Sequence, residues 1–294
     1  MASKSAKYEM VFGDAFLWLA KREPASIHAV VTDPPYGVIE YDLAQLEKRG
    51  KRGGVWRLPK KFDGANRMAL PRFTVIKDKG LKRITEFHTR FAPLLWHVLV
   101  PGAHVFVAAQ PLFTHIIASA FFNTGFEVRG QIVRLVKTFR GGDKPKFGHD
   151  EYPGVSVIPR SGWEPWLLFR KPCEGSVKDN LAKWSTGALR RPSLGTPFWD
   201  VIPSSPTSKK ERAIASHPSL KPQAFIRVIV HAALPLGKGM ILDPFAGAGS
   251  TIAAAEHLGL HSIGIEINRD YYKTASKAIP KLALYIPNGR ESPE

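Results

Sequence analysis

A chemically distinctive tetrapeptide, Asp33-Pro34-Pro35-Tyr36, follows a short apolar run at residues 27–31. Each proline fixes its own φ and keeps the residue before it out of the helical region, so the sequence predicts a stiff, extended turn. Such a turn presents the Asp33 carboxylate and the Pro34 carbonyl as two neighbouring acceptors, beside the flat ring of Tyr36. Taken alone, the tetrapeptide is equally consistent with an ordinary turn at the end of a strand.

Paired acceptors of this kind suit a substrate amine that carries two N–H donors. If they hold both hydrogens of an exocyclic base amine, the nitrogen lone pair becomes available to attack an electrophilic methyl group, and a dry pocket strengthens the effect. In-line attack then needs positioning rather than a covalent enzyme intermediate. A base inside a duplex must first be flipped out and stacked, and Tyr36 would be the stacking platform. We therefore predict Asp33, Pro34, Pro35 and Tyr36 as catalytic residues.

A glycine-containing turn at residues 243–251, Asp-Pro-Phe-Ala-Gly-Ala-Gly-Ser-Thr, follows a second apolar run and opens a predicted helix. Glycines at such a turn let the backbone approach a ligand closely. No Lys precedes Ser250 and Thr251, and Ile252 replaces the third Gly of a dinucleotide fingerprint, so a pyrophosphate ligand is disfavoured. Glu266 ends the next apolar run, at about the spacing of a carboxylate that binds ribose hydroxyls. This pattern fits a nucleoside without phosphates, such as S-adenosylmethionine.

Short apolar runs alternate with helical patterns along most of the chain, which predicts an α/β fold with a mainly parallel sheet covered on both faces. The expected strands are 8–12, 27–31, 103–108, 131–136, 166–169, 240–242 and 262–265, and the expected helices are 16–21, 85–98, 112–124, 222–234, 251–258 and 271–284. Ligands of such sheets bind at the carboxyl ends of the strands. Those ends are predicted at Asp14, Asp33, Asp243 and Glu266.

Two segments interrupt this alternation within what we predict to be a single catalytic domain, 1–294. Residues 38–81 are rich in Lys, Arg and Gly, and residues 171–216 are rich in Pro, Ser and Thr. Loops of this length in a compact domain are usually functional or disordered. We interpret the first as a DNA-contacting insertion and the second as a candidate target-recognition region.

The order of these motifs resembles the β-class amino DNA methyltransferases, a circularly permuted family in which the catalytic tetrapeptide precedes the glycine loop. The resemblance covers nearly the whole chain. It is carried by Gly13-Asp14, by 32–37, by the strand Trp163-Glu-Pro-Trp-Leu-Leu-Phe169, by the box His217-Pro-Ser-Leu-Lys-Pro222 and by the glycine loop. Leu220 and Trp163 depart from the family's usual Gln and His, so contacts from these two positions do not carry over.

The resemblance implies a mixed seven-stranded methyltransferase (Rossmann-like) sheet whose last two strands form an antiparallel pair, helices on both faces, and S-adenosylmethionine as cofactor. It also implies that the box at 217–222 helps to hold the methionine part of the cofactor. The cofactor-binding residues that we predict are Asp14, Asp33, His217, Ser219, Lys221, Asp243, Phe245, Gly247, Gly249, Ser250, Thr251 and Glu266.

A net charge of +17, from 42 Lys and Arg against 25 Asp and Glu, favours a polyanionic partner, and double-stranded DNA comes first. The predicted DNA-binding residues are Lys48, Arg49, Lys51, Arg52, Arg57, Lys60, Lys61, Arg140, Lys144, Lys146, Lys183, Arg190 and Arg191. For any one of them, a solvated surface charge is the simpler interpretation. Trp184 and Trp199 are either recognition residues or local core.

Several classes of protein are disfavoured. Cys173 is the only cysteine, and the histidines lack the paired spacing of a metal site, so we expect neither disulfides nor a bound metal. We find no signal peptide and no apolar stretch long enough to span a membrane, so we expect no membrane partner and a cytoplasmic, DNA-associated protein of bacterial or phage origin. A homodimer is left open.

Three alternatives to an N6-adenine DNA methyltransferase stay open. N4 of cytosine presents the same two donors, although family members acting on cytosine more often carry Ser where this chain has Asp33. A non-catalytic nucleic-acid-binding protein on the same fold would be expected to carry lesions in the motifs, and both motifs are intact. RNA or protein is the third alternative as methyl acceptor. C5-cytosine chemistry is disfavoured because no cysteine follows the strand at 27–31.

Overall fold

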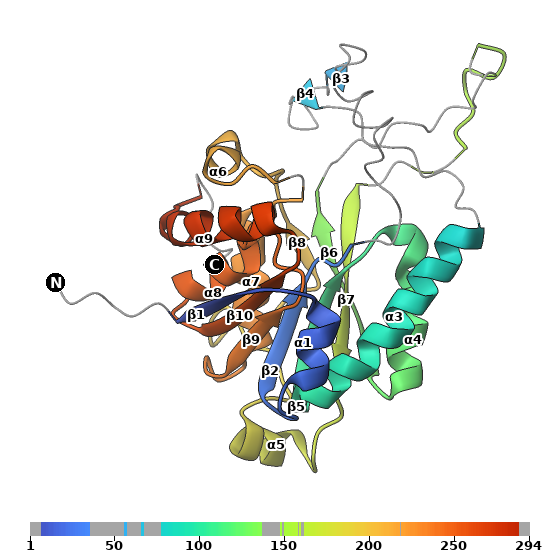
Figure 1. The fold of residues 1–294 in the computed structure, drawn as a ribbon. Coiled ribbons are helices and arrows are strands. Elements are labelled where there is room, and N and C mark those ends of the chain that lie inside the picture. Colours follow the sequence, from blue (N-terminus) through green and yellow to red (C-terminus); the bar gives the residue numbers. More distant parts are fainter. Residues whose placement is uncertain are drawn as a thin grey trace.

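A computed structural model describes residues 7–35, 78–136, 148, 150–157, 159, 162–217 and 219–287, together with the backbone of 56–57 and 66–67. In this part of the chain an eight-stranded sheet lies between two layers of helices (Figure 1). The strand order is β1-β10-β9-β2-β5-β7-β6-β8. The bounds are β1 Tyr8–Phe12, β2 Ile27–Thr32, β5 Leu99–Ala108, β6 Glu127–Leu135, β7 Trp163–Arg170, β8 Val201–Pro203, β9 Met240–Asp243 and β10 His261–Glu266.

All seven expected strands are present, with ends extended by a few residues, but the expected count of seven is wrong by one. The eighth strand, β8, is only three residues long and pairs parallel to β6, opposite Val133, Arg134 and Leu135. Its sequence lies in a segment rich in Pro and Ser, where no alternating apolar pattern could indicate a strand. Its position at the sheet edge is set by its partner strand rather than by local propensity.

The sheet is mixed, and the antiparallel element is β7. Neighbouring strands from β1 through β10, β9 and β2 to β5 are all parallel. Strand β7 runs antiparallel to both of its neighbours, β5 and β6. The expected antiparallel pair is therefore formed by β6 and β7, and the sheet continues past it into β8. Because β7 is reversed, its first residues lie at the same sheet edge as the last residues of the parallel strands.

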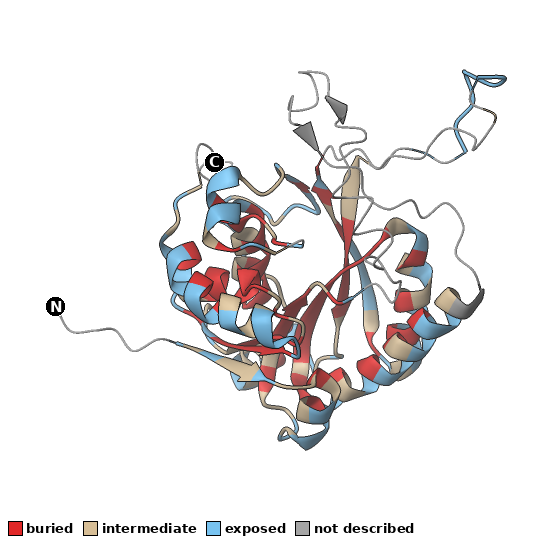
Figure 2. Ribbon diagram, turned by 45° about the horizontal axis from the view of Figure 1, so that its top comes forward, coloured by how far each residue is buried: buried red, intermediate tan, exposed pale blue. Residues whose placement is uncertain are grey.

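Helices cover both faces, as the alternation predicted. On one face lie α1 Ala15–Lys21, α3 Asp78–Val98 and α4 Thr114–Thr124, the last preceded by the 3-10 helix η2 Pro111–Phe113. On the other face lie α7 Gln223–Ala233 and α8 Ser250–His257, and α9 Arg269–Leu284 packs on α8. Adjacent residues of one strand point into opposite layers: Val30 packs with α1 and α3, whereas Val31 packs with α7. Figure 2 shows the resulting buried centre.

Two short helices and a two-residue strand pair were not expected. Helices α5, Val177–Trp184, and α6, Lys209–Ile214, each begin with a capping box, formed by Ser176 with Asp179 and by Ser208 with Glu211. A Ser followed three residues later by an acid is a recognisable sign of a helix start. Both boxes are visible in the sequence, so this signal could have located these helices. Strands β3, Trp56–Arg57, and β4, Asn66–Arg67, form a separate antiparallel pair.

Candidate active site

Four acidic residues stand at the carboxyl ends of four adjacent parallel strands. Asp14 follows β1, Glu266 ends β10, Asp243 ends β9 and Asp33 follows β2, in the order in which these strands lie in the sheet. Neighbouring strand ends are tied together, because the Gly13 amide donates to the Glu266 carbonyl at 3.1 Å. The fold therefore brings together at one edge the four residues that the sequence predicted there.

The glycine loop between β9 and α8 wraps around the Glu266 carboxylate. The amide of Gly247 donates to one carboxylate oxygen at 2.9 Å, and the amide of Asn268 donates to the other at 2.7 Å. Burial raises the pKa of Glu266, and these backbone donors act in the opposite direction. Glu266 is thus held in a fixed orientation by backbone groups from both sides of the crevice.

Two glycines of this loop are required by its geometry. Gly247 and Gly249 have φ of 52° and 83°, a backbone conformation that residues with a Cβ rarely adopt. A Cβ on Gly249 would lie 2.5 Å from Cγ1 of Ile279, and one on Gly247 would lie 3.1 Å from the His217 ring. The loop is therefore as close to α9 and to the 217–222 box as backbone can be. Gly249 is the N-cap residue of α8.

The box at 217–222 lies between the glycine loop and the turn Asp33-Pro34-Pro35, which we name the acceptor turn. The His217 ring packs edge-on against Tyr271 with ring centroids 4.3 Å apart, and its Nδ1 accepts from the Ser219 amide at 3.1 Å. The Lys221 amide donates to Oγ of Ser250 at 3.2 Å. His217, Lys221 and Ser250 are therefore brought together with the glycine loop, as the sequence predicted.

Asp243 is buried and bonded to neutral groups. Its Oδ1 accepts from the Thr32 hydroxyl at 2.8 Å and from the Phe245 amide at 3.2 Å. Burial raises the pKa of Asp243 to about 7, while hydrogen bonds from Thr32 and Thr251 act against this rise. Asp243 thus bridges β9 to β2 directly below the acceptor turn and fixes the start of the glycine loop.

Asp14 has a local structural role as well as its position at the crevice. Its Oδ1 accepts from the amides of Phe16 at 2.7 Å and Leu17 at 3.0 Å, which caps α1. A carboxylate at a helix N-terminus also complements the helix dipole. A groove of about 460 Å³ opens beside Asp14, and Phe16 and Phe87 contribute to its wall.

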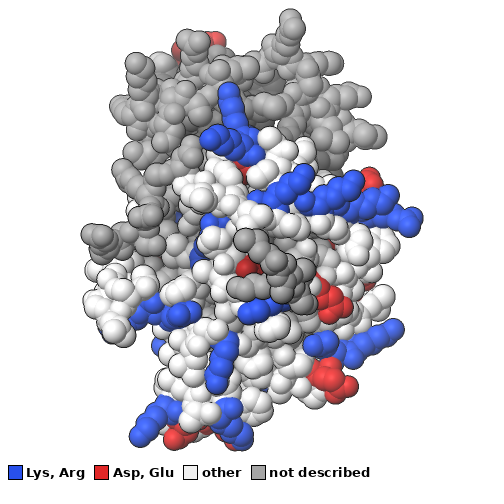
Figure 3. Space-filling view, turned by 90° about the vertical axis from the view of Figure 1, so that its left-hand side faces the viewer, with Lys and Arg blue, Asp and Glu red and all other residues white. Residues whose placement is uncertain are grey.

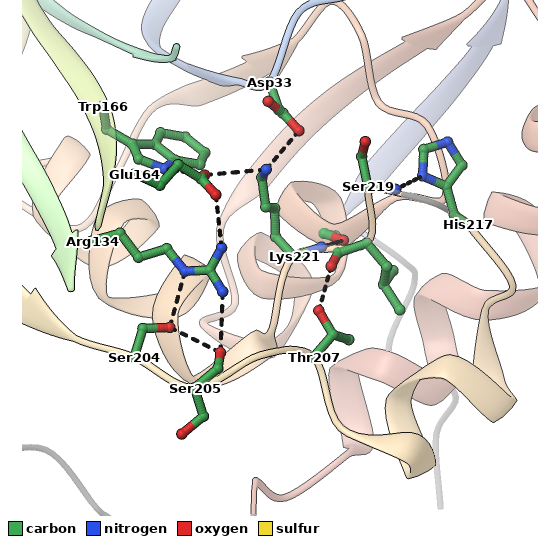
Figure 4. A network of polar contacts seen from close by, with 12 residues as sticks. Asp33, Arg134, Glu164, Trp166, Ser204, Ser205, Thr207, His217, Ser219 and Lys221 are labelled. Atoms are coloured by element: carbon green, nitrogen blue, oxygen red, sulfur yellow. Dashed lines mark hydrogen bonds and ion pairs between the residues drawn. The ribbon is translucent and has the colours of Figure 1, made fainter. Parts of the chain in front are cut away.

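The acceptor turn carries an ion network that the sequence did not predict. The Lys221 ammonium lies 2.8 Å from Oδ2 of Asp33 and 3.2 Å from Oε1 of Glu164 (Figure 4). The resemblance associated Lys221 with the cofactor, but its side chain reaches Asp33, the predicted catalytic carboxylate. The negative charges of Asp33 and Glu164 raise the pKa of Lys221 against the effect of burial. This lysine is therefore held in its charged form.

Glu164 is in turn held by two further side chains. Arg134 donates to its Oε2 at 3.0 Å, and the Trp166 indole donates to its Oε1 at 3.0 Å. Arg134 and Glu164 are directly opposite each other on β6 and β7. Residues that follow β8 complete the network, because Arg134 also donates to Oγ of Ser204 and to the carbonyl of Ser205. Burial would raise the pKa of Glu164, but the charges of Lys221 and Arg134 lower it to about 2.

Sequence reasoning missed Glu164, Arg134 and Thr32 as site residues. A charged residue in an otherwise apolar strand was the available signal for the first two, since such residues are buried only when paired. The sequence could not show that they are partners, because the pairing depends on the register of β6 against β7. Thr32 had no signal beyond its place next to Asp33.

Most predicted DNA-binding residues, and Tyr36, lie outside the described residues. The DNA-binding residues outside the described part of the chain are Lys48, Arg49, Lys51, Arg52, Lys60, Lys61, Arg140, Lys144 and Lys146. Of Arg57, only the backbone is described. Lys183 lies on α5 and is bonded to Glu174, and Arg190 lies beside Gly237 before β9. Both are at the amino ends of the strands, so the structure does not bring them to the acceptor turn. Arg191 is exposed in the segment that follows.

On the face shown in Figure 3, the charge of the described residues is basic and dispersed. Lys and Arg side chains are spread among neutral residues there, with fewer Asp and Glu between them. Trp199 is exposed, whereas Trp184 packs partly against the core. Within the described part of the chain, no helix is long and apolar enough to cross a bilayer. No group of three His, Cys, Asp or Glu residues suited to a metal ion occurs among those same residues.

Taken together, a glycine loop, a carboxylate held by two backbone amides and an adjacent Asp-Pro-Pro turn at one sheet edge are features typical of enzymes that use a nucleoside cofactor. Residues 27–277 match the model of the DNA methylase family that covers N6 and N4 methyltransferases. The chain belongs to this family of DNA methylases.

Individual relatives agree with this assignment. The chain is 26% identical over 294 residues to the type II methyltransferase M.HindIII of Haemophilus influenzae, with 89% of this chain and 92% of the relative covered. It is 23% identical to the type II methyltransferase M2.DpnII of Streptococcus pneumoniae, with 93% and 90% covered.

Solved structures show the same fold. A complex of M1.HpyAVI with S-adenosylmethionine has a TM-score of 0.56 at 19% identity and covers 92% of this chain and 98% of its own. TTHA0409 of Thermus thermophilus with S-adenosyl-L-methionine has a TM-score of 0.56 at 20% identity, covering 95% and 96%. The cytosine-N4-specific PvuII methyltransferase has a TM-score of 0.58 at 14% identity, covering 98% and 92%. The fold is therefore shared with a protein described as cytosine-N4-specific, so the fold alone does not select adenine.

Proposed function

We propose that this DNA methylase transfers a methyl group from S-adenosylmethionine to N6 of an adenine flipped out of duplex DNA. The observation that carries the proposal is the placement of Asp33 beside the glycine loop: Thr32 bonds to Asp243, which begins that loop, and Lys221 reaches Asp33 from a segment bonded to Ser250. Paired acceptors and a nucleoside crevice at one sheet edge are what attack of an amine on a sulfonium methyl requires.

The cofactor part of the proposal rests on the crevice built by 243–251 and Glu266. The Glu266 carboxylate is fixed by two amides, which leaves its remaining lone pairs for ribose hydroxyls. The structures solved as S-adenosylmethionine complexes share this fold, which supports the same choice of cofactor. His217 and Ser219, with the Lys221 backbone, would border the methionine part.

The DNA part of the proposal rests on charge and on the position of the acceptor turn. The basic insertion 38–81 follows that turn directly in the chain. The net charge of +17 favours binding of DNA phosphates. We propose that this insertion binds the duplex backbone and that Tyr36 stacks on the flipped base. The segment 171–216 is proposed as the target-recognition region.

Membership of the circularly permuted β class is also a proposal, supported by motif order. The acceptor turn follows β2 and precedes, in the chain, the glycine loop that follows β9, although β2 and β9 are neighbours in the sheet. The names of the type II relatives favour a role in restriction and modification. We prefer adenine to N4 of cytosine because Asp33 stands where family members that act on cytosine more often carry Ser. N4 of cytosine is the second candidate.

The deciding experiment is incubation of the protein with mixed-sequence duplex DNA and S-adenosylmethionine, followed by mass spectrometry of the released nucleosides. We expect N6-methyl-2′-deoxyadenosine. N4-methyl-2′-deoxycytidine would replace the adenine proposal by the second candidate. Absence of both methylated nucleosides, with single-stranded RNA and protein tested in parallel as acceptors, would contradict DNA methylation.

A further inference from the structure

The Lys221 ammonium is shared by two carboxylates that lie on different elements. Asp33 follows β2, Glu164 is the second residue of β7, and the two are 2.8 Å and 3.2 Å from Nζ. The three side chains are 16%, 14% and 11% exposed for Asp33, Glu164 and Lys221. At this degree of burial, the position of a charge changes the local potential much more than it would at the surface.

The network is electrically balanced as a group of four. Asp33 and Glu164 supply two negative charges, and Lys221 and Arg134 supply two positive charges. Other groups that face Arg134 are the Ser204 hydroxyl and the Ser205 carbonyl, which are neutral. Glu164 is therefore the residue that offsets both cations. Without it, Asp33 would be the only carboxylate of this group left to offset Lys221 and Arg134.

This balance matters for the charge movement that the proposed reaction requires. In methyl transfer the C–S bond of the sulfonium breaks and its electron pair stays on sulfur, while the amine lone pair forms the N–CH3 bond. The positive charge passes to the target nitrogen until one of its N–H protons passes to Asp33, the carboxylate that accepts its hydrogen bond. A cation 2.8 Å from the acceptor carboxylate opposes this step unless a second carboxylate draws the cation toward itself.

We propose that Glu164 is a positioning residue of the acceptor site, which holds the Lys221 ammonium between two carboxylates and so keeps the charge of Asp33 available to the target amine. This inference rests on the proposed function, because it takes Asp33 as the acceptor of the amine. A carboxylate can accept about four hydrogen bonds, so the bond from Lys221 does not by itself exclude an amine.

The first test is Glu164→Gln, which keeps the shape and the indole contact but removes the charge. We expect kcat for DNA methylation to fall about 100-fold, the range found when a group that stabilises transition-state charge is lost. KM for DNA and for S-adenosylmethionine should stay within about threefold, because ground-state binding is not altered. Unchanged kcat would overturn the inference.

A matched control exists at the other end of the sheet. Glu127 on β6 also accepts from a cation, Arg170 on β7, at 2.8 Å. Glu127→Gln therefore makes the same chemical change on the same pair of strands, away from the acceptor turn and outside the segment 171–216. We expect kcat to be unchanged in this variant. An equal loss of kcat in both variants would contradict a role specific to Glu164.

The second test separates positioning from a merely structural role. Adding Lys221→Met to Glu164→Gln removes the cation that Glu164 no longer offsets, so we expect the double variant to recover about tenfold of the lost kcat. A structural role predicts that the double variant is worse than either single variant. If Glu164→Gln alone does not fold, kcat of the double variant is compared with kcat of Lys221→Met. Values within about tenfold of each other support the inference. A larger loss of kcat in the double variant overturns it.

Failure of the inference and failure of the proposed function are distinguishable. Wild-type protein that does not methylate DNA contradicts the function, whatever the variants do. Wild-type protein that is active, with a fully active Glu164→Gln variant, contradicts only the role of Glu164.

Discussion

Two clusters that share a Glu–Lys–Trp triad occupy opposite ends of the sheet, and the first also contains Arg134. Glu164 is bonded to Lys221, Trp166 and Arg134, and Glu174 is bonded to Lys183 and Trp184. The first is buried at the carboxyl ends of the strands, and the second is exposed beside α5. The two clusters thus share the Glu–Lys–Trp triad and differ in their surroundings, which for Glu164 include Arg134 and Asp33.

The surroundings give the two carboxylates different energetic roles. Glu164 would have a raised pKa from burial alone, and the charges of Lys221 and Arg134 lower it to about 2. Hydrogen bonds from Lys183 and Trp184 lower the pKa of Glu174, and burial opposes them less strongly than they act. Exposed pairs of the second kind contribute little to stability, because water solvates the ions nearly as well. The same three residue types, Glu, Lys and Trp, therefore form an exposed ion pair at one end of the sheet and part of a buried charge network at the other.

The sharpest way to test that the buried network serves catalysis is Asp33→Ala. We expect kcat to fall about 1000-fold, because the charge that stabilises the transition state is removed in a water-poor site. Affinity for S-adenosylmethionine, measured by calorimetry, should change little. Near-normal turnover would remove Asp33 from catalysis. Asp33→Asn is the matched variant, which retains one acceptor oxygen and should lose less.

The energetic contrast between the triads is tested by removing each lysine in turn. Lys221→Met leaves two buried carboxylates with one cation, and we expect the free energy of unfolding to fall by about 3 kcal/mol. Lys183→Met should leave the free energy of unfolding unchanged within measurement error. Urea unfolding at pH 7 measures both. Equal losses would show that burial does not distinguish the two sites.

Glu266 is a carboxylate fixed by backbone amides instead of cations, and we expect its removal to have a smaller effect than the removal of Asp33 or Lys221. Glu266→Ala removes the acceptor of two amides and the proposed ribose partner, and we expect the affinity for S-adenosylmethionine to fall about 10- to 100-fold. Calorimetric titration provides the measurement. If the dissociation constant is unchanged, Glu266 is not part of the cofactor site.

Asp243 extends the comparison to a buried carboxylate bonded to neutral groups. Burial raises its pKa to about 7, above the value of the unfolded chain, so the folded state holds the proton more tightly. The stability from this proton is complete at low pH and is lost as the pH rises toward 7. Between pH 5 and pH 7 we expect wild-type protein to lose about 2 kcal/mol relative to Asp243→Asn. Parallel urea titrations of the two proteins would show no divergence if Asp243 were ionised throughout.

Local sequence was sufficient for the elements and motifs built from contiguous residues. The apolar runs located the seven longer strands, and the glycine loop was placed correctly because its conformation depends on Gly247 and Gly249 themselves. The four carboxylates at strand ends were expected at one sheet edge because parallel strands end on the same side. The second triad is also local, since Glu174 is nine residues from Lys183.

The first triad was decided by tertiary structure. Arg134 meets Glu164 only because β6 and β7 pair in one register, and Glu164 reaches the acceptor edge only because β7 is reversed. Lys221 enters from a segment 57 residues further along the chain. A charge in a strand does not specify its partner, because register and strand direction are set by the packing of the whole sheet. The sequence by itself thus determined which groups are available for chemistry, and the tertiary structure decided which charges face each other.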